Sequence, residues 1–285
     1  MEEIVKGSSV KRVDAHQHFW RYTEQEFGWI SDAMASIRRD FLPVDLRPLL
    51  NAVKIDATVA VQARQSLEET HWLLELASSN DWIAGVVGWV PLVDPQVDAV
   101  LVELAQNSRF KGVRHVLQAE PDEYMARKDF NEGISRLKKY SLIYDVLVVE
   151  RQLPETIAFV DRHPQQLFVL DHVAKPLIAA QELEPWRSYI RELGRRPNIL
   201  CKLSGMVTEA DFATWTMADL EPYVETVLEA FGPKRLMFGS DWPVCQVASS
   251  YSRWVNTVEK LLMQLSADER EWVFGRTAMQ TYGLG

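Results

Sequence analysis

Two histidines separated by one residue are the first feature of this sequence that could carry chemistry. They lie in Val13–Trp20, which reads Val-Asp-Ala-His-Gln-His-Phe-Trp. If this segment is a β-strand, alternation points Asp14, His16 and His18 to one face. Two imidazoles near a strand end could ligate one Zn²⁺ or similar ion, or hold a carbonyl by hydrogen bonds. Because His-x-His is a short pattern, a purely structural pair is an equal alternative.

Two further segments place polar side chains at the ends of apolar runs. In Leu236–Pro243 an apolar run ends in Gly-Ser-Asp, so Asp241 could accept a proton from water and complete a metal site; a turn or capping aspartate is the alternative. In Leu170–Pro176, Asp171 and His172 are adjacent, so only one of them can face inward without a bulge. The sequence favours His172.

Basic side chains occur in two more apolar runs. In the run that begins at Lys111, either Arg114 or His115 faces inward, but not both. Arg114 could supply a forked donor to an oxyanion or to substrate hydroxyls, with a salt bridge at the rim as the alternative. Lys202 could be a buried base or a paired structural lysine, and the paired interpretation is preferred.

The elements that must position these residues form a repeating pattern. Eight short, mostly apolar runs are each followed by a stretch of helical periodicity, at intervals of about one βα unit, roughly 30 residues. The uninterrupted apolar character of several runs is typical of parallel strands covered on both faces. The pattern predicts one α/β domain over residues 1–285, a (β/α)8 TIM barrel, with a doubly wound open sheet as the alternative. The predicted strands are Arg12–Phe19, Ala57–Ala63, Ile83–Val90, Lys111–Leu117, Leu142–Val148, Leu167–Ala174, Asn198–Gly205 and Arg235–Trp242.

In such a barrel the site lies where the strands end and the βα loops begin. Two of these loops are long, Trp20–Val44 after the first strand and Met206–Asp219 after the seventh. The first is rich in aromatic residues, which indicates either a lid or substrate wall, or packing onto the barrel rim.

Composition excludes several classes of protein. The chain has 285 residues, 31 Lys plus Arg against 40 Asp plus Glu, and a net charge of −9, so nothing favours nucleic acid or an anionic membrane as a partner. No apolar run approaches the roughly 20 residues that span a bilayer. The two cysteines, Cys201 and Cys245, lack metal-knuckle spacing, and the first nine residues lack the apolar core of a secretory signal. We expect a cytoplasmic protein; the sequence leaves the oligomeric state open, a homo-oligomer included.

Taken together, these motifs resemble the amidohydrolase superfamily, and in particular its amidohydrolase 2 branch. The resemblance covers essentially the whole chain, and the sugar-lactonase group is the most similar. It implies hydrolysis of a sugar aldonolactone to its acid in a sugar-oxidation pathway. The residues that carry the resemblance are 13–20, 61–65, 110–115, 170–176, 201–205 and 238–243.

One departure from the wider superfamily concerns the metal. Binuclear members bridge two metals through a carboxylated lysine near the end of the fourth strand, whereas Lys111 stands at the start of that strand. A two-metal site is therefore not expected. The branch includes members with one divalent ion and members that work without one; if an ion is present, zinc is the preferred candidate and His16, His18 and Asp241 are its expected ligands.

The resulting hypothesis gives each residue a role. Asp241 is the general base for water and then the general acid for the ring oxygen, while the histidines, directly or through one ion, and Arg114 stabilise the carbonyl oxygen. The rival interpretations are a metal-dependent decarboxylase or amide hydrolase of the same superfamily, and a non-catalytic barrel that binds a sugar acid. The candidate residues are Asp241, His172 and Arg114 for catalysis and Gln62, Trp20, Trp29, Trp89 and Trp242 for binding the small-molecule sugar lactone.

Overall fold

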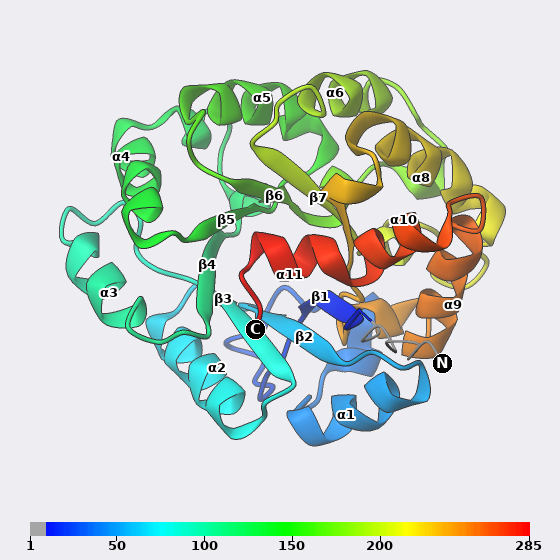
Figure 1. The fold of residues 1–285 in the computed structure, drawn as a ribbon, viewed down its shortest axis with the longest axis horizontal. Helices are drawn as coiled ribbons and strands as arrows, with labels where there is room; N and C mark the ends of the chain where they lie inside the picture. Colours follow the sequence, from blue (N-terminus) through cyan, green and yellow to red (C-terminus); the bar gives the residue numbers. More distant parts are fainter. Residues whose placement is uncertain (1–9) are drawn as a thin grey trace, which may run out of the picture.

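A computed structural model describes residues 10–285 as a barrel of parallel β-strands surrounded by α-helices (Figure 1). The eight strands pair in chain order, and the last is joined to the first where His18 N donates to the carbonyl of Trp242 at 2.6 Å. This closure confirms the predicted (β/α)8 barrel. The strands are β1 Val13–Gln17, β2 Ala57–Val61, β3 Ile83–Gly88, β4 Phe110–His115, β5 Ile143–Val146, β6 Phe168–Leu170, β7 Ile199–Leu203 and β8 Leu236–Phe238.

Each strand lies within a predicted run or begins one residue before it, but all eight strands end earlier than predicted. The largest differences are in the sixth and eighth runs, 167–174 and 235–242, of which only Phe168–Leu170 and Leu236–Phe238 are strand. From His172 to Lys175 the backbone adopts positive φ angles between 47° and 59°, which pairing with a neighbouring strand does not allow. Strand pairing therefore stops where the polar residues of the motif begin.

Helices cover the outside of the barrel (Figure 1). Several begin at a capping residue that the sequence supplies. The hydroxyl of Ser66 accepts a hydrogen bond from Glu69 N at the start of α2. Thr216 and Asp219 cap α8, which begins within the loop predicted after the seventh strand. The helices are α1 Pro43–Ala52, α2 Leu67–Ser79, α3 Val97–Leu104, α4 Lys128–Leu137, α5 Leu153–Arg162, α6 Trp186–Leu193, α7 Met206–Glu209, α8 Met217–Phe231, α9 Tyr251–Leu261, α10 Ala267–Glu271 and α11 Thr277–Thr281.

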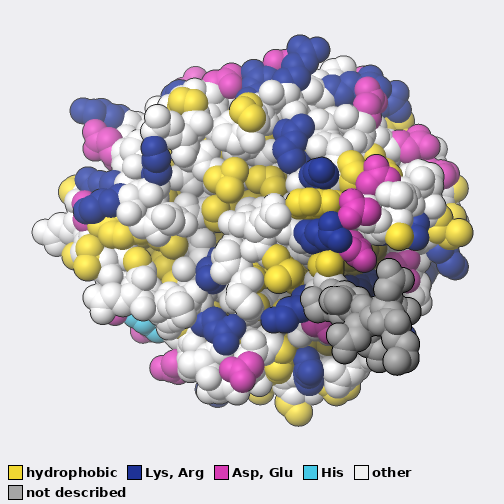
Figure 2. All heavy atoms as spheres, in the orientation of Figure 1, with side chains coloured by type: hydrophobic (Ala, Val, Ile, Leu, Met, Phe, Trp, Pro, Cys, Tyr) yellow, Lys and Arg dark blue, Asp and Glu magenta, His cyan; other side chains and the backbone are white. Residues whose placement is uncertain are grey.

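The interior of the barrel is closed at one end by the C-terminal residues. Ala278, Tyr282 and Leu284 pack with inward-facing residues such as Val59 and Val169 in one buried cluster. In Figure 1, α11 crosses the strands, and the space-filling view of the same face in Figure 2 shows side chains filling this centre. Ligands must therefore reach the interior from the opposite end, where the strands finish.

Along several strands the inward positions change from apolar to polar toward that opposite end. Val169 is followed two residues later by Asp171, and Leu200 is followed by Lys202. Residues two apart on a strand share a face, which places Leu200 and Lys202 of β7 inside the barrel. Asp171 lies just beyond β6, and its contacts with His16 and Arg114 place it inside as well. The apolar layer supports the barrel, and the polar layer above it builds the site.

Among residues 10–285, no helix is long and apolar enough to cross a membrane. The expectation that the first nine residues lack a secretory signal concerns residues outside those that the structure describes.

Candidate active site

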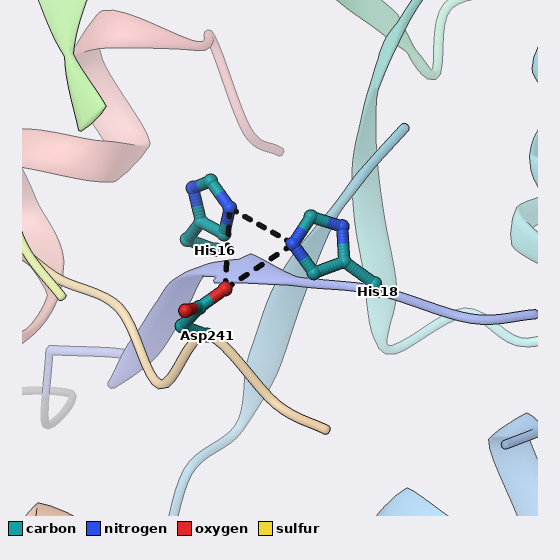
Figure 3. Close-up of side chains that lie close together, drawn as sticks. All are labelled: His16, His18 and Asp241. Atoms are coloured by element: carbon teal, nitrogen blue, oxygen red, sulfur yellow. Dashed lines mark hydrogen bonds and ion pairs between the residues drawn. The ribbon is translucent and has the colours of Figure 1, made fainter. Parts of the chain in front are cut away.

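Three of the predicted residues meet at the open end of the barrel (Figure 3). His16 Nε2 lies 3.2 Å from His18 Nε2, and His18 Nε2 lies 3.3 Å from Asp241 Oδ1. The third side of this triangle, from His16 Nε2 to Asp241 Oδ1, is 3.8 Å. The ends of β1 and β8 therefore bring two imidazole nitrogens and a carboxylate oxygen to one point.

Asp14 does not join them, contrary to the prediction from strand alternation. The pairing of β1 with β2 shifts register between Asp14 and Gln17, so the alternation is broken between Asp14 and His16. The carboxylate of Asp14 instead accepts hydrogen bonds from Ser240 N at 2.8 Å and from the Tyr251 hydroxyl at 3.0 Å. Asp14 thus fixes the backbone beside Asp241 rather than entering the site.

The groups around each imidazole indicate which nitrogen carries the proton. His18 Nδ1 lies 2.8 Å from the carbonyl oxygen of Val61, which can only accept. His16 Nδ1 lies 3.2 Å from Asp171 Oδ1 and 3.3 Å from Lys202 Nζ, while its Nε2 faces Arg114 Nη1, which can only donate, at 3.3 Å. With protons on both Nδ1 atoms, both Nε2 atoms present lone pairs toward Asp241 Oδ1. Three lone pairs converging within 4.8 Å of one another suit a divalent cation, so the donor set fits a metal ion.

His172 approaches the same carboxylate from the end of β6. Its Nε2 lies 3.9 Å from Asp241 Oδ1, and its Nδ1 lies 2.9 Å from the Ser204 hydroxyl. The close packing requires glycine at position 205, because a Cβ there would lie 2.5 Å from His172 Nδ1. The residues that directly follow β7 therefore fix the orientation of this imidazole.

The prediction that only one of Asp171 and His172 reaches the interior was wrong. Strand β6 ends at Leu170, and His172 has a φ of 52°, so simple alternation no longer applies to the two residues. Asp171 contacts His16 while His172 contacts Asp241. The left-handed backbone turns two adjacent side chains toward one site.

Burial and neighbouring groups set the charges in this cluster. Burial lowers the pKa of His172 to about 4 and that of His16 well below its usual value, so both imidazoles are neutral at pH 7. Burial alone would raise the pKa of Asp241, but His172, His18 and His16 together lower it below its usual value. The site thus combines an ionised carboxylate with neutral imidazoles, which are the forms that bind metals and accept protons.

Arg114, rather than His115, faces the interior. Its guanidinium donates to Asp171 Oδ2 and to Gln62 Oε1, both at 2.9 Å, and lies 3.3 Å from His16 Nε2. It is almost fully buried, which excludes the alternative of a salt bridge at the rim. The amide nitrogen of Gln62 is buried without a hydrogen-bond partner among the described residues, so it is free to donate to a ligand.

A buried ion network lies beneath the site, and most of it was missed by the sequence analysis. Lys202 pairs with Asp145 and lies 3.1 Å from Asp171 Oδ1, so it is a paired lysine, the interpretation preferred from the sequence. The Tyr282 hydroxyl donates to Asp145 Oδ1 at 2.8 Å. The sequence signal that could have revealed this network was a charged residue at an inward position of an apolar run. Asp145 is such a residue in the run 142–148.

The four tryptophans proposed to bind substrate lie in different environments. Trp20 and Trp242 are fully buried, where they pack around Phe41, so neither offers a ring face to a ligand in this structure. Trp89 Nε1 lies 3.2 Å from His115 Nδ1, whereas Trp29 is 46% exposed on the long loop after β1. Most residues of that loop are exposed, but five apolar side chains pack inward, which supports packing onto the barrel rim for these five: Trp20, Phe27, Ile30, Ile37 and Phe41.

The fold and the site together define a (β/α)8-barrel enzyme whose reacting groups lie at the C-terminal ends of the strands. Residues 13–284 match the protein family described as Amidohydrolase, and the chain belongs to that family.

Three similar proteins extend this comparison. The chain is 44% identical to an L-fucono-1,5-lactonase of Burkholderia multivorans and 38% identical to one of Burkholderia ambifaria, in each case over 96% of both chains. Its structure superposes with a TM-score of 0.94 on the crystal structure of a Burkholderia multivorans amidohydrolase with bound zinc, at 44% identity over 96% of this chain and 100% of that one. In this chain, His16, His18 and Asp241 form a group that could hold a divalent metal ion.

Proposed function

We propose that this protein is a lactonase that hydrolyses a sugar 1,5-lactone, such as L-fucono-1,5-lactone, to the aldonic acid in L-fucose degradation. The observation that carries the proposal is the ionised Asp241 carboxylate, held 3.3 to 3.9 Å from the Nε2 atoms of three histidines at the open end of the barrel. Lactone hydrolysis needs a base for water, donors for the carbonyl oxygen and an acid for the leaving alkoxide. The similarity to the two Burkholderia lactonases supports this choice of substrate.

In this mechanism Asp241 moves the protons. Its ionised carboxylate accepts a proton from the attacking water, and the resulting carboxylic acid then donates that proton to the ring oxygen as the ester bond breaks. Backbone hydrogen bonds hold the residue in position: Asp241 N donates to the carbonyl of His16 at 2.8 Å, and Cys245 N donates to the carbonyl of Asp241 at 2.9 Å. The carboxylate therefore stays aimed at one point through both transfers.

The carbonyl oxygen of the lactone becomes an oxyanion when water attacks, and it needs hydrogen-bond donors. His172 can provide one, because its Nε2 faces the Asp241 carboxylate, which can only accept, so the ring proton belongs on Nε2 and Nδ1 accepts from the Ser204 hydroxyl. The buried amide of Gln62 and the guanidinium of Arg114 are the other donors. Trp29 and Trp89 remain candidates for contact with the sugar, whereas Trp20 and Trp242 would first have to leave the core.

A metal ion is held in this proposal by His16, His18 and Asp241, with zinc as the preferred ion. When bound, it would act as a Lewis acid and lower the pKa of bound water. Asp171 and Val61 fix the two imidazoles from behind, which is how outer partners commonly orient metal-binding histidines.

We expect chelator-stripped protein, dialysed against zinc, to bind about one Zn²⁺ per chain. His18→Ala removes one of the three converging lone pairs and should weaken binding by more than the roughly 10- to 100-fold that loss of an outer partner costs. Competition with a chromophoric chelator measures this. His71→Ala, which changes an exposed histidine on α2, is the control. Equal zinc affinity in His18→Ala and wild type would contradict the assigned ligands.

The pKa of His172 predicts how the rate depends on pH. Its folded-state pKa of about 4 lies below the usual 6.5, so the imidazole stays neutral as the pH falls and gains a proton only near pH 4. We therefore expect the contribution of neutral His172 to kcat/KM to persist at about pH 5. Rates of wild type and His172→Gln between about pH 4 and 8 test this. An acid limb near pH 6.5 that disappears in His172→Gln would show that the pKa is not lowered.

The proposed function is tested by following acid release with a pH indicator. L-fucono-, L-rhamnono- and D-galactono-lactones of both ring sizes are the substrates, first in chelating buffer and then with Zn²⁺ or Mn²⁺ restored. Turnover above the spontaneous rate supports a lactonase and ranks its sugars. No acid release above the spontaneous rate under any of these conditions would favour the decarboxylase or amide hydrolase of the same superfamily. Stabilisation by a sugar acid without turnover would favour a binding protein. The cytoplasmic location and the oligomeric state stay predictions.

A further inference from the structure

An ion pair at the rim of the site has no role in the mechanism above. Lys175 Nζ lies 3.6 Å from Glu209 Oε1, and the two side chains are 22% and 24% exposed. A direct charge-assisted hydrogen bond would be about 2.7–2.9 Å long. At 3.6 Å the ammonium and the carboxylate are too far apart for such a bond, so each keeps hydrogen-bonding capacity that the other does not use. Both side chains are nevertheless largely withdrawn from solvent.

The position of the pair in the fold places it beside the reacting groups. Lys175 is the last residue of the left-handed segment that begins with His172, and Glu209 ends α7, the short helix that starts directly after Gly205. Gly205 is also the residue against which the His172 ring packs. Both partners of the pair therefore come from the two βα loops that hold His172.

The electrostatics of Glu209 agree with this position. Burial raises its pKa, Lys175 lowers it, and the charges of Asp241 and Glu150 raise it again. Asp241 follows β8 and Glu150 follows β5, so Glu209 faces groups from other loops at the open end of the barrel. The carboxylate thus lies within electrostatic reach of Asp241, and it is largely withdrawn from bulk solvent.

A sugar lactone needs partners of this kind. Its ring hydroxyls each donate and accept, and hydroxyls on neighbouring carbons can engage an ammonium donor and a carboxylate acceptor at the same time. The groups assigned to the carbonyl oxygen, the attacking water and the ring oxygen are not assigned to bind these hydroxyls. A pocket that hydrogen-bonds a substrate hydroxyl discriminates strongly against a molecule that lacks it, because buried polar groups are then left unpaired.

We propose that Lys175 and Glu209 together bind hydroxyl groups of the sugar ring and select hydroxylated lactones as substrates. This proposal rests on the proposed function. The ammonium donates to one hydroxyl oxygen and the carboxylate accepts the proton of the same or the adjacent hydroxyl. The alternative, an ion pair that only ties the β6 and β7 loops together, makes a different prediction in the experiment below.

The experiment compares wild type, Glu209→Gln and Lys175→Met on L-fucono-1,5-lactone and its monodeoxy analogues. On the full substrate we expect each variant to lose on the order of tenfold or more in kcat/KM, mainly through KM. On the analogue that lacks the recognised hydroxyl, wild type and variant should agree within about twofold, because the interaction is already absent. Glu229→Gln, which breaks an exposed ion pair with Arg191 between α6 and α8, is the matched control.

Two results would overturn the proposal. Equal losses on the full lactone and on every analogue would mean that the pair only supports the loops. Unchanged kcat/KM on the full lactone would mean that the pair does not touch the substrate. Thermal melting of each variant checks that the fold is retained, and a wild type that hydrolyses no lactone at all would instead refute the proposed function.

Discussion

Asp241→Asn is expected to lower kcat for lactone hydrolysis on the order of a thousandfold while the barrel stays folded. An amide cannot take the proton of the attacking water, and general acid–base catalysis is typically worth about 10²- to 10⁴-fold. The change is nearly isosteric, and the main-chain hydrogen bonds to His16 and Cys245 do not involve the altered group. Initial rates from the pH-indicator assay, together with a thermal melt, measure both parts.

Asp122→Asn is the matched control, since it makes the same change on an exposed carboxylate of the loop that follows β4. It should leave kcat unchanged. A rate within about tenfold of wild type in Asp241→Asn would exclude Asp241 as the proton carrier, because that residual rate exceeds what the other groups should supply. Loss of the zinc bound by Asp241→Asn, measured in parallel, would separate a failure to hold metal from a failure to move protons.

The sequence was most informative where function and fold coincide at a strand end. His16, His18 and Asp241 were found because polar residues close otherwise apolar runs, and the carboxyl ends of parallel strands meet at one end of a barrel. The barrel followed from the eightfold repeat alone. Neither inference depends on the exact boundary of any strand, which is why both survive strands that end earlier than expected.

The sequence was least informative where the backbone leaves regular geometry. Alternation predicted Asp14 on the same face as His16, and it predicted that Asp171 and His172 exclude each other; a register shift in β1 and a left-handed turn after β6 reverse both results. Tertiary packing decides such irregularities, and no local periodicity encodes them. Burial of Trp20 and Trp242 is similar, because an indole serves a core as well as a sugar.

Lys202→Met is expected to produce the largest loss of stability among these variants. The ammonium lies between Asp145 and Asp171, both fully buried, so its removal leaves the Asp145 carboxylate without a counter-charge. Breaking a buried ion pair typically costs about 3–5 kcal/mol, a large part of the roughly 5–15 kcal/mol that stabilises a domain. Urea denaturation of metal-free protein measures the change in the free energy of unfolding. Lys111→Met, on β4 and only partly buried, should cost clearly less.

The pH dependence of the loss of stability in Lys202→Met identifies the carboxylate that is left without a counter-charge. Burial raises the pKa of Asp145 to about 6 even though Lys202 lowers it, so removing Lys202 must raise this pKa further. Over the pH range between its unfolded and folded pKa values the folded protein then binds more protons than the unfolded chain, and stability falls as the pH rises. Lys202→Met should therefore be less destabilising at pH 5 than at pH 8.

The second substitution in Lys202→Met/Asp145→Asn removes the unpaired charge, while Asp171 keeps Arg114 as a partner. It should restore part of the stability and flatten the pH dependence; a double variant as unstable and as pH-sensitive as the single one would refute the role of Asp145.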